Sequence, residues 1–197
     1  MNTSIQSIAQ KTLEEAKIIF GVSDVSVEVL EDPEQVIPET GAGGFAHNSH
    51  LISVYYDLQN ENFKNNFEKE IRSTIMHEFH HVVRNRKYDW KKDTLLGAMI
   101  TEGLADHFDI EVNGGNPKPW SVALSESELS RVLKLAVNEF NSRDFSYEEW
   151  FFGLSEKNIP KWAGYSIGFD LVKKYILKSG KKASELVFEP AETFWDK

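Results

Sequence analysis

A pair of histidines one helical turn apart is the clearest candidate for chemistry in this sequence. His77 and His81 enclose Glu78 in the string HEFHH, which contains the pattern HExxH. On an α-helix, residues four apart lie on the same face, so both imidazoles can bind one cation. Glu78 lies about 100° around the helix from His77, where its carboxylate can reach a metal-bound water without becoming a ligand. These residues predict a metal-dependent hydrolytic site with Glu78 as general base.

The rest of the predicted metal site comes from a second acidic motif. The chain has no cysteine, so any metal would be held by imidazole and carboxylate groups. Catalytic zinc sites commonly use three protein ligands and leave a fourth position to water. Glu102, which follows His81 by 21 residues, is the natural third ligand for Zn²⁺ beside His77 and His81. Asp106 follows at i+4 on the same helical face and can accept the free ring N–H of a ligand histidine.

Ala105 and Gly103, both close to Glu102 in the sequence, bear on this interpretation of the site. Glu78 and His81 also form ExxH, half of the di-iron carboxylate motif, but Ala105 occupies the place where a second such motif after Glu102 needs histidine. The di-iron class is therefore disfavoured. Gly103 costs about 1 kcal/mol inside a helix, which suggests a close approach of two helices beside the metal.

Periodicity predicts the elements that would position these residues. Residues 4–20 have helical spacing, residues 25–29 alternate as in a strand, and two short strands are expected around a turn at Asn48 and Ser49. After Asp57 the period changes to that of a long helix carrying HExxH. Its apolar face is predicted to consist of Phe67, Ile71, Ile75, Phe79 and Val82. A second helix should begin at Asp93 or Thr94 and carry Glu102.

The remainder of the chain is predicted to be mainly helical. Ser125 and Glu128 form a candidate capping box, and the segments YEEWFFG, 162–178 and KKASELVF suit helices better than strands. With 197 residues, we expect one domain over residues 1–197. It would be an α+β fold with a small mixed or antiparallel sheet. Its parts would be a helix and sheet in 1–60, the metal-site helices in 61–112 and a helical part in 120–197.

Composition narrows the classes of partner. A formal net charge of −9 disfavours nucleic acid, whose affinity depends on neutralising phosphates. The basic stretch from Arg84 to Lys92 is interpreted as a solvated loop. No segment approaches the ~20 apolar residues that a membrane span needs, and the N-terminus does not resemble a signal peptide. A cytoplasmic location without membrane association is therefore the default expectation, and the oligomeric state stays open.

The two motifs together resemble those of a known group of enzymes. HEFHH followed by TEGLADHF is similar to the gluzincin pattern of HExxH plus ExxxD. More narrowly, it resembles an uncharacterised bacterial family of predicted Zn-dependent proteases with HEYHH-like and EGLA-like motifs. The likeness extends to Gly43, Gly44 and Phe45 and to the string AGYSIGFDLV. It implies a zincin-like metallopeptidase fold and zinc-dependent hydrolysis of a peptide or protein substrate.

The resemblance also implies roles for residues outside the metal motifs. In gluzincins a strand beside the active-site helix commonly pairs with extended substrate, and the run from Gly43 to His47 is similar in position. Gly44, Phe45 and His47 are thereby implied to bind substrate. Tyr165, in GYSIG, looks like the phenol that some gluzincins direct at the oxyanion, although an aromatic core residue is an equal alternative.

Two other functions remain open at this point. One is a binding or regulatory protein that keeps the zincin scaffold without turnover, because motifs propose chemistry and do not demonstrate it. The other is a zinc hydrolase that acts on a non-peptide amide or ester.

Overall fold

Residues 2–154 and 158–195 are described by the structure, a computed structural model. The chain divides into two units. The first contains Met1–Lys87 and Val112–Gly114, and the second contains Tyr88–Glu111 and Gly115–Lys197. The expectation of a single domain over the whole chain stays a prediction.

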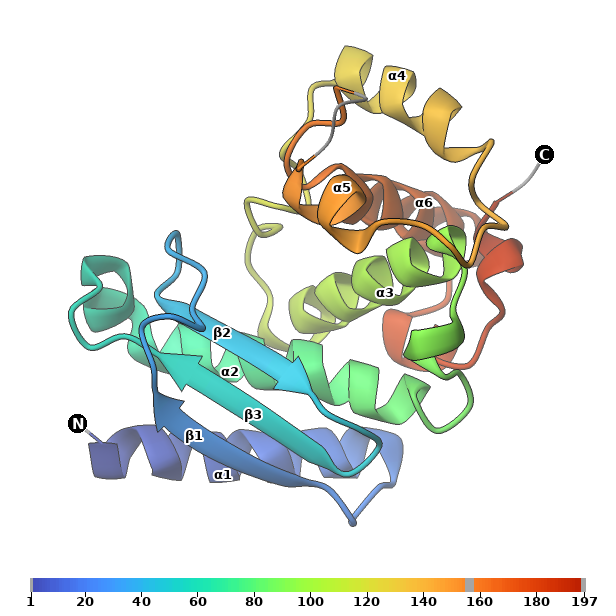
Figure 1. Ribbon diagram of the computed structural model, residues 1–197. Coiled ribbons are helices and arrows are strands. Elements are labelled where there is room, and N and C mark those ends of the chain that lie inside the picture. The colour runs from blue at the N-terminus through green and yellow to red at the C-terminus, as the bar shows by residue number, and fades with distance from the viewer. Residues whose placement is uncertain (1, 155–157, 196–197) are drawn as a thin grey trace. The chain divides into compact units, whose positions relative to one another are not determined.

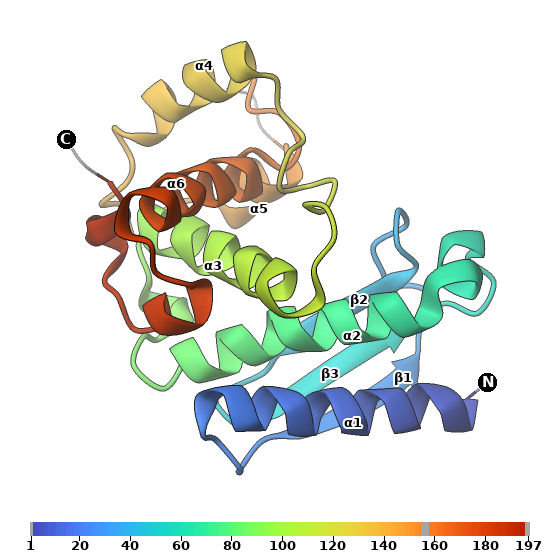
Figure 2. The ribbon, with the colours of Figure 1, turned by 180° about the vertical axis from the view of Figure 1, so that it is seen from behind.

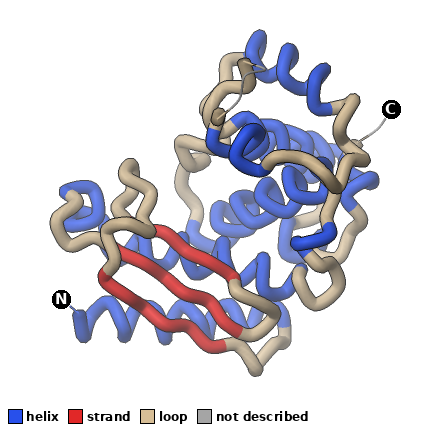
Figure 3. The backbone as a smooth tube through the Cα atoms, in the orientation of Figure 1, coloured by secondary structure: helices blue, strands red, loops and turns tan. Residues whose placement is uncertain are grey.

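The first unit contains a small mixed sheet and two helices (Figure 1). Its elements are α1 (Asn2–Phe20), β1 (Ser26–Glu31), β2 (Ala42–Ala46), β3 (Leu51–Tyr56) and α2 (Glu61–Arg84). The strand order is β1-β3-β2, with β1 parallel and β2 antiparallel to β3, as the labelled arrows of Figure 1 show. In Figure 3 the strands lie side by side. The predicted small mixed sheet and helix-rich α+β class are confirmed.

Helices α1 and α2 lie on the same face of this sheet, as the rear view in Figure 2 shows. Val54 is fully buried and pairs with Gly44, which lies against α2. Side chains alternate along a strand, so Ile52 and Val54 point toward the helices while Ser53 points to the opposite face. We call this opposite face the open face of the sheet, because no helix of the first unit covers it among the described residues (Figure 1).

Helix α2 begins at a cap that the sequence makes possible. Asn60 is the N-cap, and its side-chain oxygen accepts hydrogen bonds from the backbone N–H groups of Asn62 and Phe63. Farther along, Ile71, Ile75, Phe79 and Val82 are fully buried, which confirms most of the predicted apolar face.

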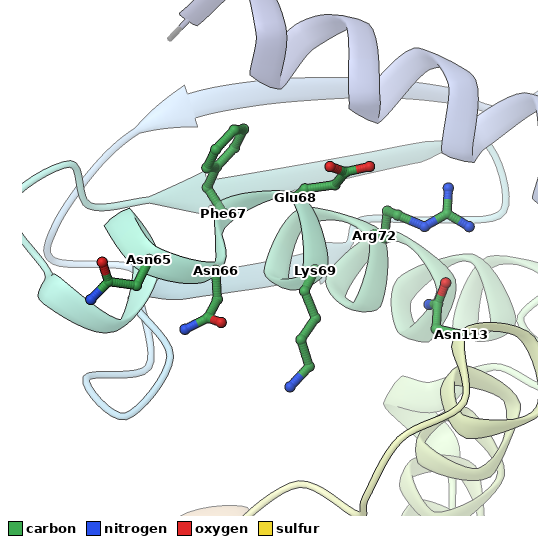
Figure 4. A pocket seen from close by; sticks show the side chains of 7 residues that line it. All are labelled: Asn65, Asn66, Phe67, Glu68, Lys69, Arg72 and Asn113. Carbon is green, nitrogen blue, oxygen red and sulfur yellow. The ribbon is translucent and has the colours of Figure 1, made fainter.

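The helix is interrupted at Asn66, which periodicity did not predict. Asn66 has φ −135°, and its side-chain amide donates to the carbonyl of Asn62. Asparagine side chains compete in this way for helical backbone groups. Beside this kink the surface has a pocket of about 490 Å³ into which Asn66 and Lys69 extend (Figure 4). Phe67 lies past the kink and is only half-buried, unlike the rest of the predicted face.

The second unit is helical, in agreement with the predicted C-terminal part. Its elements are η1 (Trp90–Lys92), α3 (Leu95–Asn113, apart from its last two residues), α4 (Glu126–Ala136), α5 (Tyr147–Phe152), α6 (Ala163–Ser179), η2 (Ala183–Leu186) and η3 (Ala191–Phe194). The capping box of Ser125 and Glu128 is present at the start of α4. The KKASELVF segment forms a short 3-10 helix and not a regular α-helix.

Glycines allow α3 and α6 to come into backbone contact. A Cβ atom on Gly103 would overlap the carbonyl oxygen of Gly168, and one on Gly168 would overlap the carbonyl of Met99. The predicted close approach of two helices at Gly103 is therefore confirmed, with α6 as the partner helix, and its place beside the metal stays a prediction.

The basic stretch is only partly the solvated loop that was expected. Arg84 is 2% exposed and belongs to α2, so it is a buried residue and not part of a loop. Trp90 is half exposed, and the Lys91 ammonium lies 5.5 Å from the centre of its ring. None of the helices within the described ranges combines the length and the apolar character of a membrane span.

Candidate metal centre

The two histidines of α2 converge on one point. Their Nε2 atoms are 3.0 Å apart, and the ring planes are inclined by 83°. A tetrahedral zinc ion with Zn–N bonds of 2.0–2.1 Å would hold two nitrogens about 3.3 Å apart. The pair therefore has the separation and convergence that a shared ion requires, and the predicted arrangement of His77 and His81 along one helical face is present.

Glu78 lies beside strand β2, on the helix-covered face of the sheet. It is 8% exposed. A Cβ atom built on Gly44 would lie 2.5 Å from the Cγ atom of Glu78, 2.7 Å from Cγ2 of Thr74 and 2.8 Å from Oε1 of Glu78. Only glycine at position 44 leaves room for this carboxylate. The absence of a side chain there allows Glu78 to lie against β2.

Glu102, in the second unit, is held by a tyrosine that the sequence did not single out. The hydroxyl of Tyr147 donates to Oε1 of Glu102 at 3.0 Å, and the hydroxyl of Tyr165 lies 3.5 Å from that of Tyr147. The ring of Tyr147 stacks on Phe151 with centroids 4.0 Å apart. Because 45 residues separate Tyr147 from Glu102, no local spacing could have indicated this pairing.

Burial raises the pKa of Tyr147 well above its usual value of 10, and the negative charge of Glu102 raises it further. The phenol therefore keeps its proton at neutral pH. It remains a hydrogen-bond donor to the carboxylate. A donor at this position restricts the rotation of the Glu102 side chain, as outer partners of ligand carboxylates commonly do.

Asp106 is almost fully buried one turn after Glu102, and both of its carboxylate oxygens accept hydrogen bonds. Oδ1 accepts from the indole N–H of Trp120 at 3.3 Å, and Oδ2 accepts from the hydroxyl of Ser121 at 2.6 Å. These donors fix the orientation of the carboxylate. Its predicted hydrogen bond to a ligand histidine stays a prediction.

The residues implied to bind substrate lie on two faces of the sheet. Gly44 is next to Glu78, whereas Phe45 and His47 alternate to the open face. Their rings are in edge-on contact with centroids 4.9 Å apart, and Nε2 of His47 lies 2.7 Å from the hydroxyl of Ser53.

His77 and His81 offer two imidazole nitrogens and Glu102 offers a carboxylate, which are donor types that can hold a metal ion. Two histidines and one glutamate match one of the established ligand sets of catalytic zinc. Ca²⁺ and Mg²⁺ prefer oxygen ligands alone, so the chemistry of the set favours zinc.

Comparisons with known proteins agree with this chemistry. Two uncharacterised proteins of Bacillus subtilis (strain 168) are similar. YjaZ is 32% identical over 132 residues, covering 64% of this chain and 50% of YjaZ. YjfC is 24% identical over 176 residues, covering 83% of this chain and 57% of YjfC. The matches thus span about half the length of these relatives. No solved structure matches the chain. Residues 5–196 match the family model described as "Predicted Zn-dependent protease (DUF2268)", so the chain belongs to this family.

Proposed function

We propose that this protein is a zinc-dependent metallopeptidase with a zincin-like fold. The observation that carries the proposal is the convergence of the His77 and His81 Nε2 atoms, 3.0 Å apart, on the helix that also holds Glu78 beside β2. Membership of a family described as predicted Zn-dependent proteases supports the same conclusion.

In this proposal His77, His81 and Glu102 hold the metal, and Tyr147 and Asp106 are hydrogen-bond partners of the ligand side chains. Zinc in such a site supplies a Lewis acid that polarises a carbonyl and lowers the pKa of water toward ~7. Tyr147 limits the rotation of Glu102 through the hydrogen bond of 3.0 Å. Asp106 would accept the free ring N–H of a ligand histidine and so fix its tautomer.

Glu78 is the proposed general base. Its carboxylate takes a proton from the attacking water and later gives that proton to the leaving amine, which breaks the peptide bond and leaves a carboxylic acid and an amine. Tyr165 is proposed to donate a hydrogen bond to the oxyanion that develops on the scissile carbonyl. A phenol suits this role because it stays protonated at neutral pH.

Strand β2 is the proposed binding edge for the substrate backbone. In the pairing with β3, the N–H of His47 donates to the carbonyl of Leu51 and the N–H of Asp57 donates to the carbonyl of Gly41. Backbone groups alternate along an antiparallel strand, so those of Gly44 and Ala46 point away from β3. An extended peptide can pair with them, which aligns its backbone at the strand position next to Glu78.

The test is Glu78→Gln, compared with Glu68→Gln on the same helix. Glu68 is exposed, so its substitution controls for loss of one negative charge from α2. We expect Glu78→Gln to retain zinc and to lose peptidase turnover by about 10²–10⁴-fold, the usual contribution of a general base. Zinc per chain and turnover on a broad peptide library would be measured for the wild type and both variants.

The same measurements separate the alternatives. Full peptidase turnover by zinc-loaded Glu78→Gln would remove the mechanism. Bound zinc without hydrolysis of any peptide by the wild type would favour a binding protein on this scaffold. Hydrolysis of small esters or amides without cleavage of peptides would point to a different zinc hydrolase.

A further inference from the structure

On the open face of the sheet, hydrogen bonds link Glu28 of β1 to Ser53 of β3 and Ser53 to His47, which follows β2. Ser53 is fully buried, and its hydroxyl donates to Oε1 of Glu28 at 2.5 Å. A hydroxyl has one proton, so the contact of 2.7 Å with His47 requires that Nε2 of His47 be the donor. The neutral ring of His47 is thereby held with its proton on Nε2, and Nδ1 is left as an acceptor.

Phe45 lies next to this histidine on the same face. It is 45% exposed, and its ring meets that of His47 edge to face at 4.9 Å. The register opposes both Phe45 and Glu28 to Ser53, so the three residues form one row across the sheet. An aromatic surface and an oriented imidazole therefore stand together on the edge strand.

A peptide paired with β2 would bring its own side chains to this row. The backbone of Phe45 points toward β3, so it occupies a non-hydrogen-bonded position for an antiparallel partner on the outer edge. Side chains directly opposite in such positions have Cβ atoms about 4.5–5.5 Å apart. The substrate residue opposite Phe45 faces the open side, and the residue two positions along reaches His47.

We propose that Phe45 and His47 form a specificity site for two substrate side chains, with Ser53 and Glu28 as positioning residues that orient His47. This site rests on the proposed peptidase function. Phe45 selects an aromatic or aliphatic side chain. His47 accepts a hydrogen bond at Nδ1, and the carboxylate of Glu28 with the net charge of −9 favours a cationic donor. The substrate class is a peptide in which a lysine or arginine lies two positions from a large apolar residue.

Binding of fluorescent peptides to zinc-loaded Glu78→Gln protein tests the site apart from hydrolysis. The peptides carry phenylalanine or alanine at one position and lysine, norleucine or glutamate two positions along. In successive peptides this pair of residues is shifted by one position, so that every register with β2 is sampled. In one register we expect phenylalanine to exceed alanine by about tenfold in affinity, and lysine to exceed norleucine by about fivefold. Phe45→Ala should abolish the first preference and His47→Ala the second.

Matched controls come from the same sheet. Leu30 is 44% exposed on β1, at the opposite edge, so Leu30→Ala should leave both preferences unchanged. His50→Ala removes an exposed histidine that pairs with Asp24 and should also have no effect. Ser53→Ala should reduce the lysine preference as His47→Ala does, without changing the phenylalanine preference. If Ser53→Ala does not fold, Glu28→Gln, an exposed change, should still lower the lysine preference.

The outcomes distinguish this site from the catalytic proposal. If the wild type cleaves peptides and Phe45→Ala and His47→Ala keep both preferences, the specificity site is wrong and the peptidase function stands. If the preferences are present in binding but no peptide is cleaved, the site stands and the peptidase function fails. Absence of either preference in every register overturns the site.

Discussion

Two tyrosine hydroxyls near Glu102 are predicted to have different tasks. Tyr147→Phe removes the donor to Oε1 of Glu102 but keeps the ring that stacks on Phe151. We expect zinc affinity to fall by about tenfold, the lower end of the effect of losing an outer partner of a metal ligand. Tyr165→Phe should keep zinc affinity and lower kcat by about 10²-fold, because it removes a donor to the oxyanion.

Competition with a chelator of known affinity would measure the first effect, and steady-state kinetics on a cleaved peptide would measure the second. Equal zinc affinity in Tyr147→Phe and wild-type protein would mean that the phenol does not orient the ligand. A loss of zinc in Tyr165→Phe would show that the hydroxyl of Tyr165 supports the metal and does not act on the oxyanion.

A third residue should make stability depend on pH. Burial lowers the pKa of His107, whose Nε2–H donates to the carbonyl of Phe169 while its ring stacks on the Phe169 ring. The unfolded chain has a higher histidine pKa, about 6.5, and so binds more protons when the pH falls below that value. The stabilising contribution is present above pH ~6.5 and is lost as the pH falls.

His107→Gln keeps an N–H donor without the titration, so its melting temperature should fall less than that of the wild type between pH 7 and pH 5. Equal falls in both proteins would contradict this assignment.

At the scale of elements, the contact of β2 with α2 depends on a glycine. Gly44→Ala would press a methyl group on the side chains of Glu78 and Thr74. These side chains can turn, so we expect a loss of stability of about 1–3 kcal/mol together with a displaced general base. Zinc binding should persist while kcat falls. Gly43→Ala is the comparison, because its Cβ would overlap the backbone carbonyl of Gln35, far from Glu78 in the chain.

Chemical denaturation and kinetics of both variants would separate the two effects. We expect Gly43→Ala to lose more stability, since backbone yields less readily than a side chain, and to keep its kcat at a temperature where it is folded. A Gly44→Ala protein with unchanged kcat would show that the carboxylate does not need the room that glycine leaves.

The sequence predicted these elements well where one local rule decides the structure. Periodicity and caps identified the helix that carries His77 and His81, the strands around Asn48 and the capping box at Ser125. They did not predict the interruption at Asn66, because it arises from a side-chain hydrogen bond to Asn62 within an otherwise regular pattern. Periodicity also gave no sign of Tyr147, whose contact with Glu102 depends on tertiary packing across 45 residues.

For the whole molecule, a metal that binds the native state must stabilise it. Glu102 follows His81 by 21 residues, so the unfolded chain rarely brings the complete donor set together. Zinc at 100 times its dissociation constant would add about 2.7 kcal/mol to the free energy of unfolding. For a chain of this size, that corresponds to a rise in melting temperature of about 5–10 °C.

The thermal unfolding of chelator-treated protein, with and without added zinc, would measure this rise. The intrinsic fluorescence of the 5 tryptophans provides the signal. His77→Ala should abolish the rise because one imidazole cannot replace the pair, whereas His50→Ala, which removes an exposed histidine of the first unit, should keep it. A His77→Ala protein that zinc stabilises as much as the wild type would show that the ion binds elsewhere. Since zinc bound to Glu78→Gln should stabilise as in the wild type, the same assay would separate loss of the base from loss of the metal.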